Sequence, residues 1–220
     1  MKNPAIDTVR FNFDFYDNLF LLSFQIKPQI RAFAEYEKVN SYMLFGNNNP
    51  MNIEIGTGNG EFLEYMAKKR CAENFIGFEI IKKVFSKAVN RMKRSALKNV
   101  RLIHYDGVFF IKMLANNSIK DVYINFPDPW PKRKHNKRRL INTDFLKLIG
   151  EKIIPDGLIY IVTDHREYAA QIAKNFEFPG FKSTFDKVCS NKLIDYFETK
   201  YYRKFAYQNA VYFFKVKKSY

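Results

Sequence analysis

The chain has 220 residues, which is enough for one sizeable domain with a full hydrophobic core. Its 37 lysines and arginines outnumber its 22 aspartates and glutamates, and the net charge of +15 favours a polyanionic partner, nucleic acid before an anionic membrane. The two cysteines suggest neither a disulfide framework nor a four-ligand zinc site, and the longest early apolar run, at residues 19–22, is far too short to span a bilayer. We therefore expect a soluble cytoplasmic protein.

The N-terminal residues predict an arm or hairpin that packs on the main domain. Apolar and polar side chains alternate over residues 9–15, which is the periodicity of a strand. Asp17-Asn18 can turn that strand back along residues 19–24, and a lone hairpin would be only marginally stable in water. A turn-rich segment then begins at Gly46. The predicted division is an N-terminal arm at 1–45 and a main domain at 46–220.

From residue 51 onwards, strand and helix signals alternate five times. Strands are predicted at 51–55, 74–78, 100–104, 121–125 and 157–162. Helices are predicted at 61–70, 81–97 (basic and amphipathic), 108–115, 142–152 and 166–176. Two last strands are predicted near 181–188 and 210–216. Repeated strand–helix units indicate an α/β fold with a parallel, doubly wound sheet.

A glycine-rich loop joins the first of these strands to its helix. Gly56, Gly58 and Gly60 allow a tight turn and a close approach of backbone to a ligand, although many such turns bind nothing. The nicotinamide fingerprint needs glycine where this chain has Glu61, and acids at positions 54 and 61 would repel a diphosphate. A cationic ligand without phosphate fits Glu54 and Glu61 better. S-adenosylmethionine, with a sulfonium and an ammonium group, is such a ligand.

Acidic residues also follow the next three predicted strands. Glu79 follows the second strand, about twenty residues beyond the last glycine, where an acid usually binds ribose hydroxyls. Asp106 follows the third strand and Asp128 the fourth. Because ligands of open α/β sheets lie at the carboxyl ends of the strands, these acids predict a binding site there. Glu79 and Asp106 also precede helices, so capping of those helices is the alternative role.

The loop at residues 125–139 has the most distinctive composition. Proline on both sides of Asp128 restricts its backbone, and the only tryptophan of the chain, Trp130, follows. A cationic run comes next: Lys132, Arg133, Lys134, Lys137, Arg138 and Arg139. A rigid carboxylate, an aromatic ring and this run suit an enzyme that holds a nucleic acid by its phosphates and a base by its edge and face. A rigid turn leading into a solvated basic helix is the alternative.

Four motifs occur in order: EIGTGNG from Glu54, FPDPW from Phe126, HNKRR from His135, and Thr163-Asp164. With them the chain resembles the bacterial single-chain tRNA (guanine-N7-)-methyltransferase family over about residues 40–216. The resemblance implies a Rossmann-like class I methyltransferase fold, with a mostly parallel sheet of seven strands and an antiparallel last strand. It implies S-adenosyl-L-methionine as methyl donor, S-adenosyl-L-homocysteine as product and tRNA as partner. Monomer and homodimer stay equally open, and residues 1–39 match no element of the family.

The resemblance also implies roles for individual residues. The family's contacts with S-adenosylmethionine fall on Glu54, Glu79, Asp106 and Asp128, beside the loop of Gly56, Gly58 and Gly60, and Asp128 also matches its catalytic residue. Its RNA contacts fall on Lys132, Asp164, Thr199, Lys200, Tyr201 and Tyr202. The family has glutamate where this chain has Tyr202. Either Glu198 replaces that contact from a neighbouring position or the contact is absent.

Methylation of guanine N7 makes modest chemical demands. N7 carries a lone pair and no proton, so the reaction needs in-line alignment with the methyl–sulfur bond, and neither a strong base nor a metal. Positive charge passes to the purine, and a carboxylate beside it can stabilise that charge while accepting from the N1–H and N2–H₂ edge. We assign this role to Asp128. Trp130 either stacks on a flipped base or packs in the wall or core.

The predicted function is transfer of a methyl group from S-adenosylmethionine to N7 of a guanosine in the variable loop of tRNA. Three other functions fit parts of the pattern. A non-catalytic RNA-binding protein on this scaffold would keep the basic loop and lose the cofactor acids, yet all four are present. Glu61 opposes a nicotinamide-dependent oxidoreductase. A methyltransferase for exocyclic amines would carry Asn/Asp-Pro-Pro-aromatic after the fourth strand, to which FPDPW is only loosely similar.

Overall fold

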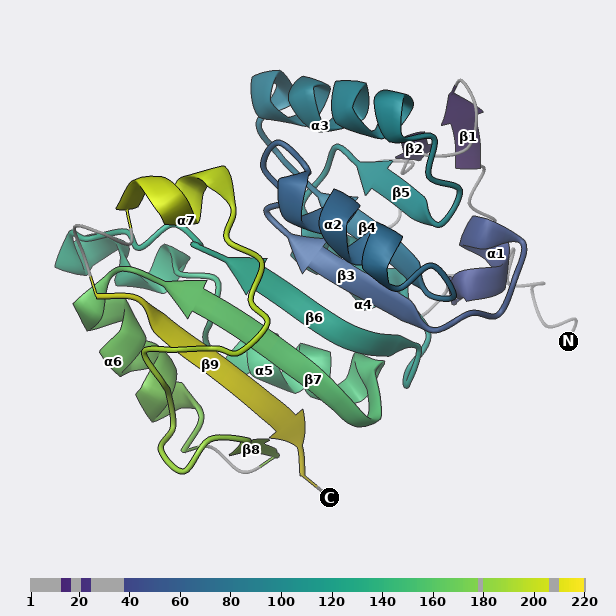
Figure 1. Cartoon of the computed structure of the whole chain (residues 1–220). Helices are drawn as coiled ribbons and strands as arrows, with labels where there is room; N and C mark the ends of the chain where they lie inside the picture. The colour runs from purple at the N-terminus through teal and green to yellow at the C-terminus, as the bar shows by residue number, and fades with distance from the viewer. Residues whose placement is uncertain (1–12, 17–20, 25–37, 178–179, 206–209, 220) are drawn as a thin grey trace, which may run out of the picture.

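The computed structural model describes residues 13–16, 21–24, 38–177, 180–205 and 210–219. Residues 9–12 and Asp17-Asn18, which belong to the predicted hairpin, lie outside this part of the chain. The described strands form one sheet (Figure 1). They are β1 (Phe13–Tyr16), β2 (Leu21–Phe24), β3 (Met51–Ile55), β4 (Asn74–Phe78), β5 (Val100–Ile103), β6 (Ile119–Asn125), β7 (Ile153–Thr163), β8 (Phe181–Ser183) and β9 (Tyr212–Lys218).

The strands follow the order β1-β2-β5-β4-β3-β6-β7-β9-β8 across the sheet. From β5 to β7 all neighbours are parallel, whereas β9 is antiparallel to both β7 and β8. The seven strands β3 to β9 confirm the predicted mostly parallel, doubly wound sheet with an antiparallel last strand. β1 and β2 pair antiparallel, as a hairpin does, and β2 extends the sheet by pairing with β5. The division into an arm and a main domain at residue 45 stays a prediction.

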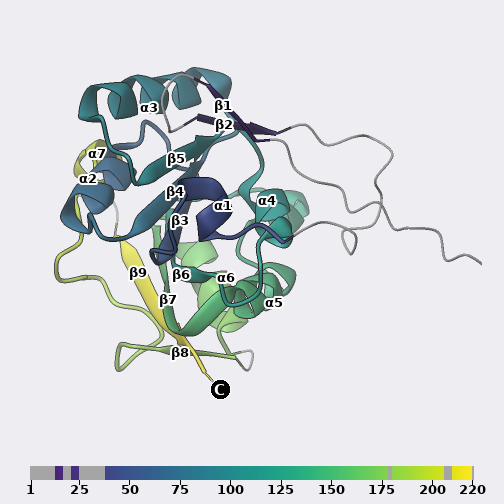
Figure 2. The ribbon, with the colours of Figure 1, turned by 90° about the vertical axis from the view of Figure 1, so that its right-hand side faces the viewer.

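Helices cover both faces of the sheet. They are α1 (Ser41–Phe45), α2 (Glu61–Lys69), α3 (Lys82–Ser95), α4 (Gly107–Met113), α5 (Thr143–Lys152), α6 (Arg166–Asn175), α7 (Lys200–Phe205) and the 3-10 helix η2 (Arg133–Arg138). Figure 2 shows α2 and α3 on one face, and α4, α5 and α6 on the other. No helix in the described part of the chain is long and apolar enough to cross a membrane.

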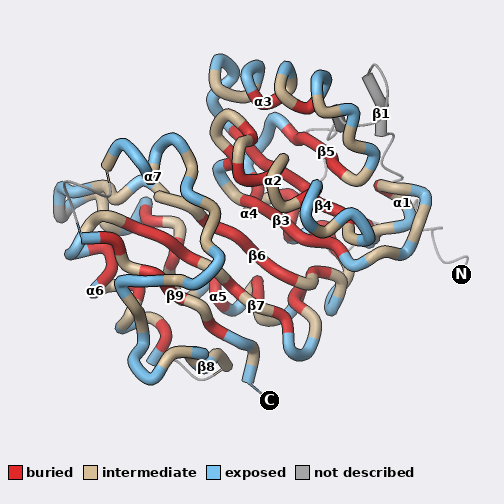
Figure 3. Tube along the Cα trace, in the orientation of Figure 1, coloured by how far each residue is buried: buried red, intermediate tan, exposed pale blue. Residues whose placement is uncertain are grey.

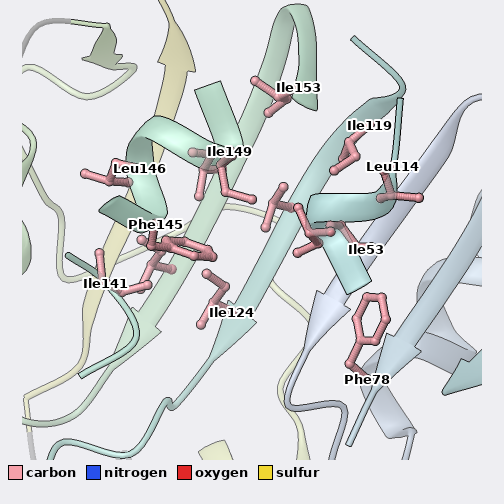
Figure 4. Packing of buried hydrophobic residues seen from close by; sticks show 14 of the residues in the cluster. Ile53, Phe78, Leu114, Ile119, Ile124, Ile141, Phe145, Leu146, Ile149 and Ile153 are labelled. Atoms are coloured by element: carbon pink, nitrogen blue, oxygen red, sulfur yellow. The ribbon is translucent and has the colours of Figure 1, made fainter. Parts of the chain in front are cut away.

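The two faces of the sheet follow from the alternation of side chains along each strand. On β3, the buried Ile53 joins the apolar cluster beneath α4 and α5, where it lies near Phe78 (Figure 4). The next residue, Glu54, points to the opposite face. Figure 3 shows β3, β4 and β6 buried along most of their lengths, while the outer turns of α3 are exposed. Each fully buried Ile or Phe contributes roughly 1.5–3 kcal/mol, so this core firmly positions the strand ends.

Several predicted boundaries are wrong for identifiable reasons. The strand predicted at 181–188 ends at Ser183, because the Ser183 hydroxyl donates to the Lys187 carbonyl at 2.8 Å and accepts from the Phe185 amide at 3.1 Å, which closes a turn. The strand predicted at 157–162 already begins at Ile153. The helices α1 and α7 were not predicted, because five and six residues are too few to show a helical period.

Candidate active site

The carboxyl ends of β3, β4, β5 and β6 open into a cavity of about 660 Å³, within the range of roughly 300–1,000 Å³ typical of ligand pockets. Three of the four predicted acids line it: Glu79, Asp106 and Asp128. Gly56 and Trp130 line it as well. The fold therefore brings the ends of separate βα units to one site, as the parallel sheet predicts.

The glycine loop needs left-handed backbone at each of its three glycines. Gly56, Gly58 and Gly60 have φ values of 76°, 58° and 76°, which disfavour residues with a Cβ. The amides of Gly56 and Thr57 both donate to the Phe78 carbonyl, at 2.9 and 2.8 Å, so the loop is tied to the end of β4. Of the three glycines, Gly56 alone belongs to the cavity lining. Gly58 and Gly60 shape the loop behind it.

Glu79 connects this loop to the start of α3. Its Oε2 accepts from the Gly58 amide at 3.0 Å and its Oε1 from the Ile81 amide at 2.9 Å. The residue is only 8% exposed, yet it lines the cavity. Each carboxylate oxygen has a second lone pair, so these contacts leave Glu79 able to accept from ligand hydroxyls. It does not cap α3, whose N-cap is Ile81.

Asp106 is a helix cap and a cavity residue at once. Its Oδ1 accepts from the amides of Val108 and Phe109, at 2.8 and 3.2 Å, and so caps α4. The alternative role considered for Asp106 is thus observed. Both bonds go to one oxygen, and Asp106 still lines the cavity. Capping therefore does not exclude a contact with a ligand.

Glu54 lies beneath the glycine loop and is not among the residues that line the cavity. Its Oε2 accepts from the Thr57 hydroxyl at 2.8 Å, and its Oε1 from the Asn125 side-chain amide at 3.0 Å. Asn125 in turn accepts from the Tyr196 hydroxyl at 3.1 Å. Burial raises the pKa of Glu54 to about 8, although the bonds from Thr57 and Asn125 lower it and Glu79 adds a smaller repulsion. A buried network thus joins the glycine loop, β6 and a distant loop.

The loop that carries Asp128 is held in an unusual backbone conformation. Phe126 and Trp130 have φ values of 50° and 42°, in a region that non-glycine residues seldom adopt. The guanidinium of Arg139 donates to the Pro129 carbonyl at 2.7 Å and to the Gln171 side chain at 2.5 Å. Arg139 is buried, so its assignment to the phosphate-binding run is corrected: it braces the loop. Asp128 itself is exposed at the cavity.

Trp130 forms part of the cavity wall and is not a core residue. The His135 ring meets it edge-on at 5.8 Å, and the Arg138 guanidinium lies 5.0 Å from its ring centroid. Around it, η2 and its N-cap residue present exposed cations, which we call the η2 basic surface: Lys132, Lys134, Lys137 and Arg138. This surface adjoins Asp128, as the sequence predicted.

The predicted RNA contacts near the C-terminus lie beside the same cavity. The Tyr201 ring packs 4.7 Å from that of Phe126, and its pKa is raised by burial and then by the carboxylates of Asp164 and Asp128. The Lys200 amide donates to Glu61 at 2.8 Å. The structure therefore brings α7 and Asp164 to the loop that carries Asp128, although 36 residues or more separate them along the chain.

Tyr202 has a different position from Tyr201. Its ring packs against Tyr196 at 5.4 Å and Phe213 at 6.3 Å, within an apolar cluster over β7 and β9. The Thr199 hydroxyl accepts from the Tyr202 amide at 3.1 Å and starts the helical turn. Tyr202 thus anchors α7 through its aromatic ring, at the position where the family has glutamate. The neighbouring Glu198 is exposed.

Two site residues could not be found from the sequence. Tyr196 and Asn125 are 71 residues apart, and no periodic signal marks either of them as a partner of Glu54. Glu61, which was considered only for its charge beside the glycine loop, also pairs with Arg203 at 3.3 Å. Both contacts fasten the segment before β9 onto the cofactor side of the site. Among the described residues, no group of histidine, cysteine and acidic side chains is arranged to hold a metal ion.

Comparison with known proteins places this geometry in a family. Residues 48–214 match the model of a family described as putative methyltransferases. The tRNA (guanine-N(7)-)-methyltransferase of Bacillus subtilis is 40% identical over 142 residues, which are 64% of this chain and 67% of that protein. This chain belongs to the tRNA (guanine-N7-)-methyltransferase family. The enzyme of the same name from Buchnera aphidicola is also 40% identical, over 72% of this chain, and the chain spans 65% of that relative's length.

The family assignment confirms the resemblance expected from the four motifs. Solved structures agree on the fold. An rRNA methylase from Streptococcus thermophilus superposes with a TM-score of 0.54 at 13% identity, over 79% of this chain and 89% of that one. At this identity the likeness concerns the class I methyltransferase fold alone. In this member of the tRNA (guanine-N7-)-methyltransferase family, the glycine loop and the FPDPW loop thus meet at one cavity.

Proposed function

We propose that this protein transfers the methyl group of S-adenosylmethionine to N7 of a guanosine in the variable loop of tRNA, in the cytoplasm. The observation that carries the proposal is the position of Asp128. It lines one cavity with Glu79 and the glycine loop, and it is followed directly by the η2 basic surface. The names of the relatives from Bacillus subtilis and Buchnera aphidicola support the same activity.

The residues present suit S-adenosylmethionine. Glu79 and Asp106 line the cavity as acceptors for hydroxyl and amine donors, and Gly56 lets the backbone approach closely. Acceptors in these places fit a cationic donor and oppose a diphosphate. Glu54 contributes from below the loop, since a cationic ligand nearby would favour its ionised form and offset the burial that raises its pKa. When bound, the donor supplies an electrophilic methyl group on sulfur.

Asp128 would orient the guanine. Its carboxylate accepts from the N1–H and N2–H₂ edge, and its negative charge stabilises the positive charge that develops on the purine. The hydrogen bond from Arg139 to the Pro129 carbonyl and the fixed φ of the flanking prolines hold the carboxylate in place before the substrate binds. This lowers the entropy cost of ordering it. Trp130 offers a ring face at the cavity wall, on which a flipped base can stack.

The η2 basic surface would hold phosphates around the target nucleotide, with Lys132 closest in sequence to Asp128. Tyr201 packs on Phe126 in the Asp128 loop and lies near Asp164, and we assign Asp164 and the segment from Thr199 to Tyr201 to the RNA as well. Tyr202 supports this segment from behind.

The decisive experiment supplies purified protein, labelled methyl donor and a tRNA transcript, and then digests the RNA for nucleoside mass spectrometry. The expected product is 7-methylguanosine. A matched transcript with 7-deazaguanosine at the target position should accept no label, because it lacks the N7 lone pair. Label on an exocyclic amine would identify the other type of methyltransferase, and tight RNA binding without any transfer would identify a non-catalytic binding protein.

A further inference from the structure

The outward face of α3 carries a concentration of positive charge that the active site does not use. Lys82, Lys83, Lys87, Lys93 and Arg94 are exposed, and α3 contains no acidic residue at all. Arg91 is the cation of this helix that turns inward, where it pairs with Glu64 at 2.8 Å. None of the five exposed cations has an ion-pair partner among the residues that the structure describes. They are therefore available to a polyanion.

The first-turn lysines of α3 do not serve the stability of the helix. The amino end of a helix carries partial positive charge, so cations there are unfavourable. Lys82 and Lys83 nevertheless occupy the first turn, and Ile81 at the N-cap supplies no side-chain hydrogen bond. Cations in the last turn, Lys93 and Arg94, have the ordinary favourable placement. Lys82 and Lys83 are thus unfavourable at this end of the helix unless a negatively charged partner offsets their repulsion.

The apolar side of α3 is already covered. Ala88 and Met92 are buried in the cluster beneath α2 and α3. The exposed positions between the lysines are polar, Ser86 and Asn90. A helix that enters a membrane interface needs an apolar face that it can insert. Within α3 the exposed positions carry only cations and small polar groups, and the exposed Ile80 and Ile81 lie ahead of its first turn, where they line the cavity. The outward face of the helix itself therefore suits phosphates.

The amino end of α3 borders the catalytic cavity on the side opposite to η2. Ile80 and Ile81, which lead into α3 from β4, line the cavity, and so do Lys137 and Arg138 of η2, which follow β6. In the sheet, β3 lies between β4 and β6. The cavity is therefore flanked by two cationic elements, and a nucleotide entering it would have its neighbouring phosphates within reach of both.

We propose that α3 is a second docking surface for tRNA, and that Lys82, Lys83 and Lys87 bind the phosphate backbone on the side of the target guanosine away from η2. This inference rests on the proposed function. It adds an RNA contact on an element that carries none of the family motifs.

The test compares the wild-type protein with two triple variants of α3 and one control variant. Lys82→Gln/Lys83→Gln/Lys87→Gln removes three charges, whereas Lys82→Arg/Lys83→Arg/Lys87→Arg keeps them. A matched control, Lys174→Gln/Lys182→Gln/Lys187→Gln, removes three exposed charges on α6 and beyond, at the other edge of the sheet. Binding of a tRNA transcript is measured between about 50 and 200 mM salt, where phosphate contacts dominate the affinity.

The glutamine variant of α3 should flatten the slope of log affinity against log salt by about two to three, at roughly 0.7–0.9 per phosphate contact. Its KM for tRNA should rise, while its affinity for S-adenosylhomocysteine stays unchanged and its melting temperature stays the same or increases. The arginine variant should keep the wild-type slope. Equal slopes for the α3 variant and the control, or a flattened slope in the arginine variant, would overturn the proposal.

Two further outcomes distinguish RNA binding by α3 from membrane binding by α3 and from the proposed methyltransferase activity. Vesicles of equal phosphatidylglycerol and phosphatidylcholine test the membrane alternative, and loss of vesicle binding with an unchanged RNA slope would also overturn the proposal. Absence of 7-methylguanosine in the wild-type reaction would refute the proposed function instead. In that case a flattened RNA slope would still establish α3 as an RNA-binding surface.

Discussion

At the residue scale, Asp128 is an exposed carboxylate on a backbone that has little freedom to move. The bond from Arg139 to Pro129 and the left-handed Phe126 and Trp130 hold the loop independently of the Asp128 side chain. Substitution of Asp128 should therefore change the chemistry of the site and leave the fold intact.

Asp128→Asn should lower the turnover number by roughly 10²–10³, the usual effect of losing one preorganised electrostatic group. Asp128→Ala should lower it further, because it also removes the hydrogen bonds to the guanine edge. Single-turnover methylation of tRNA measures the effect, with Asp186→Asn, an exposed acid in the loop after β8, as the control. Wild-type turnover in Asp128→Ala would remove Asp128 from the mechanism.

Glu54 makes stability depend on pH in a definite direction. Burial raises its pKa to about 8 from the ordinary 4.5, so the folded protein holds this proton more tightly than the unfolded chain. The stabilising effect of the bound proton is complete below about pH 4.5 and is lost as the pH rises towards 8.

Glu54→Gln should remove this pH dependence. The glutamine can accept from Asn125 and donate to the Thr57 hydroxyl, so both contacts survive. Relative to wild type, the free energy of unfolding of the variant should rise by about one to a few kcal/mol between pH 5 and pH 8. Urea unfolding at both pH values measures it, with the exposed Glu167→Gln as the control. If the variant and wild type differ in free energy of unfolding by the same amount at pH 5 and pH 8, Glu54 ionises normally in the folded protein.

At the element scale, the glycine loop and the packing of α2 on α3 depend on the same residue. Gly60 is the N-cap of α2 with φ 76°, and a Cβ there would lie 3.2 Å from the Ala88 Cβ and 3.0 Å from the Met92 Cε. Gly46 ends α1 with a similar φ of 72°, but open space surrounds it. The two glycines separate backbone strain from steric crowding.

Gly46→Ala should lower the free energy of unfolding by about 1–2 kcal/mol, the cost of a left-handed residue with a Cβ. Gly60→Ala should lower the free energy of unfolding by about 1–3 kcal/mol more than Gly46→Ala does, because α3 must shift away from α2. It should also weaken binding of S-adenosylhomocysteine, which Gly46→Ala should not. Chemical denaturation and calorimetry measure the two effects. Equal losses of stability would mean that Met92 and Ala88 adjust without cost.

At the scale of the whole molecule, the net charge of +15 is distributed so that cations lie on both sides of the cavity. Lys134→Gln/Lys137→Gln should flatten the salt dependence of tRNA binding by about 1.5, at roughly 0.7–0.9 per phosphate contact. Combined with the glutamine variant of α3, the two reductions should add, because they remove contacts on separate elements. A combined effect no larger than the α3 effect alone would contradict two independent surfaces. Binding of S-adenosylhomocysteine should be unchanged in the α3 variant.

Local patterns in the sequence determined most of the fold. From Met51 to Asn175, apolar side chains recur with periods of 2 residues in strands and 3.6 residues in helices, and this pattern predicts their alternation. Glycine marks the turn after β3. Parallel strands bring their carboxyl ends to one edge, so the sequence was also sufficient to place Glu79, Asp106 and Asp128 together.

The use of individual charged and polar side chains depends on the tertiary fold, because burial and partners come from segments far apart in the chain. Lys132 to Arg139 reads as one basic run, yet Arg139 turns inward to the Pro129 carbonyl. Glu54 is buried by elements that follow it by tens of residues, and its network reaches Tyr196. The position of α3 beside the cavity likewise follows from the strand order, which places β4 and β6 on either side of β3. That order results from packing both faces of the sheet, which no local pattern encodes.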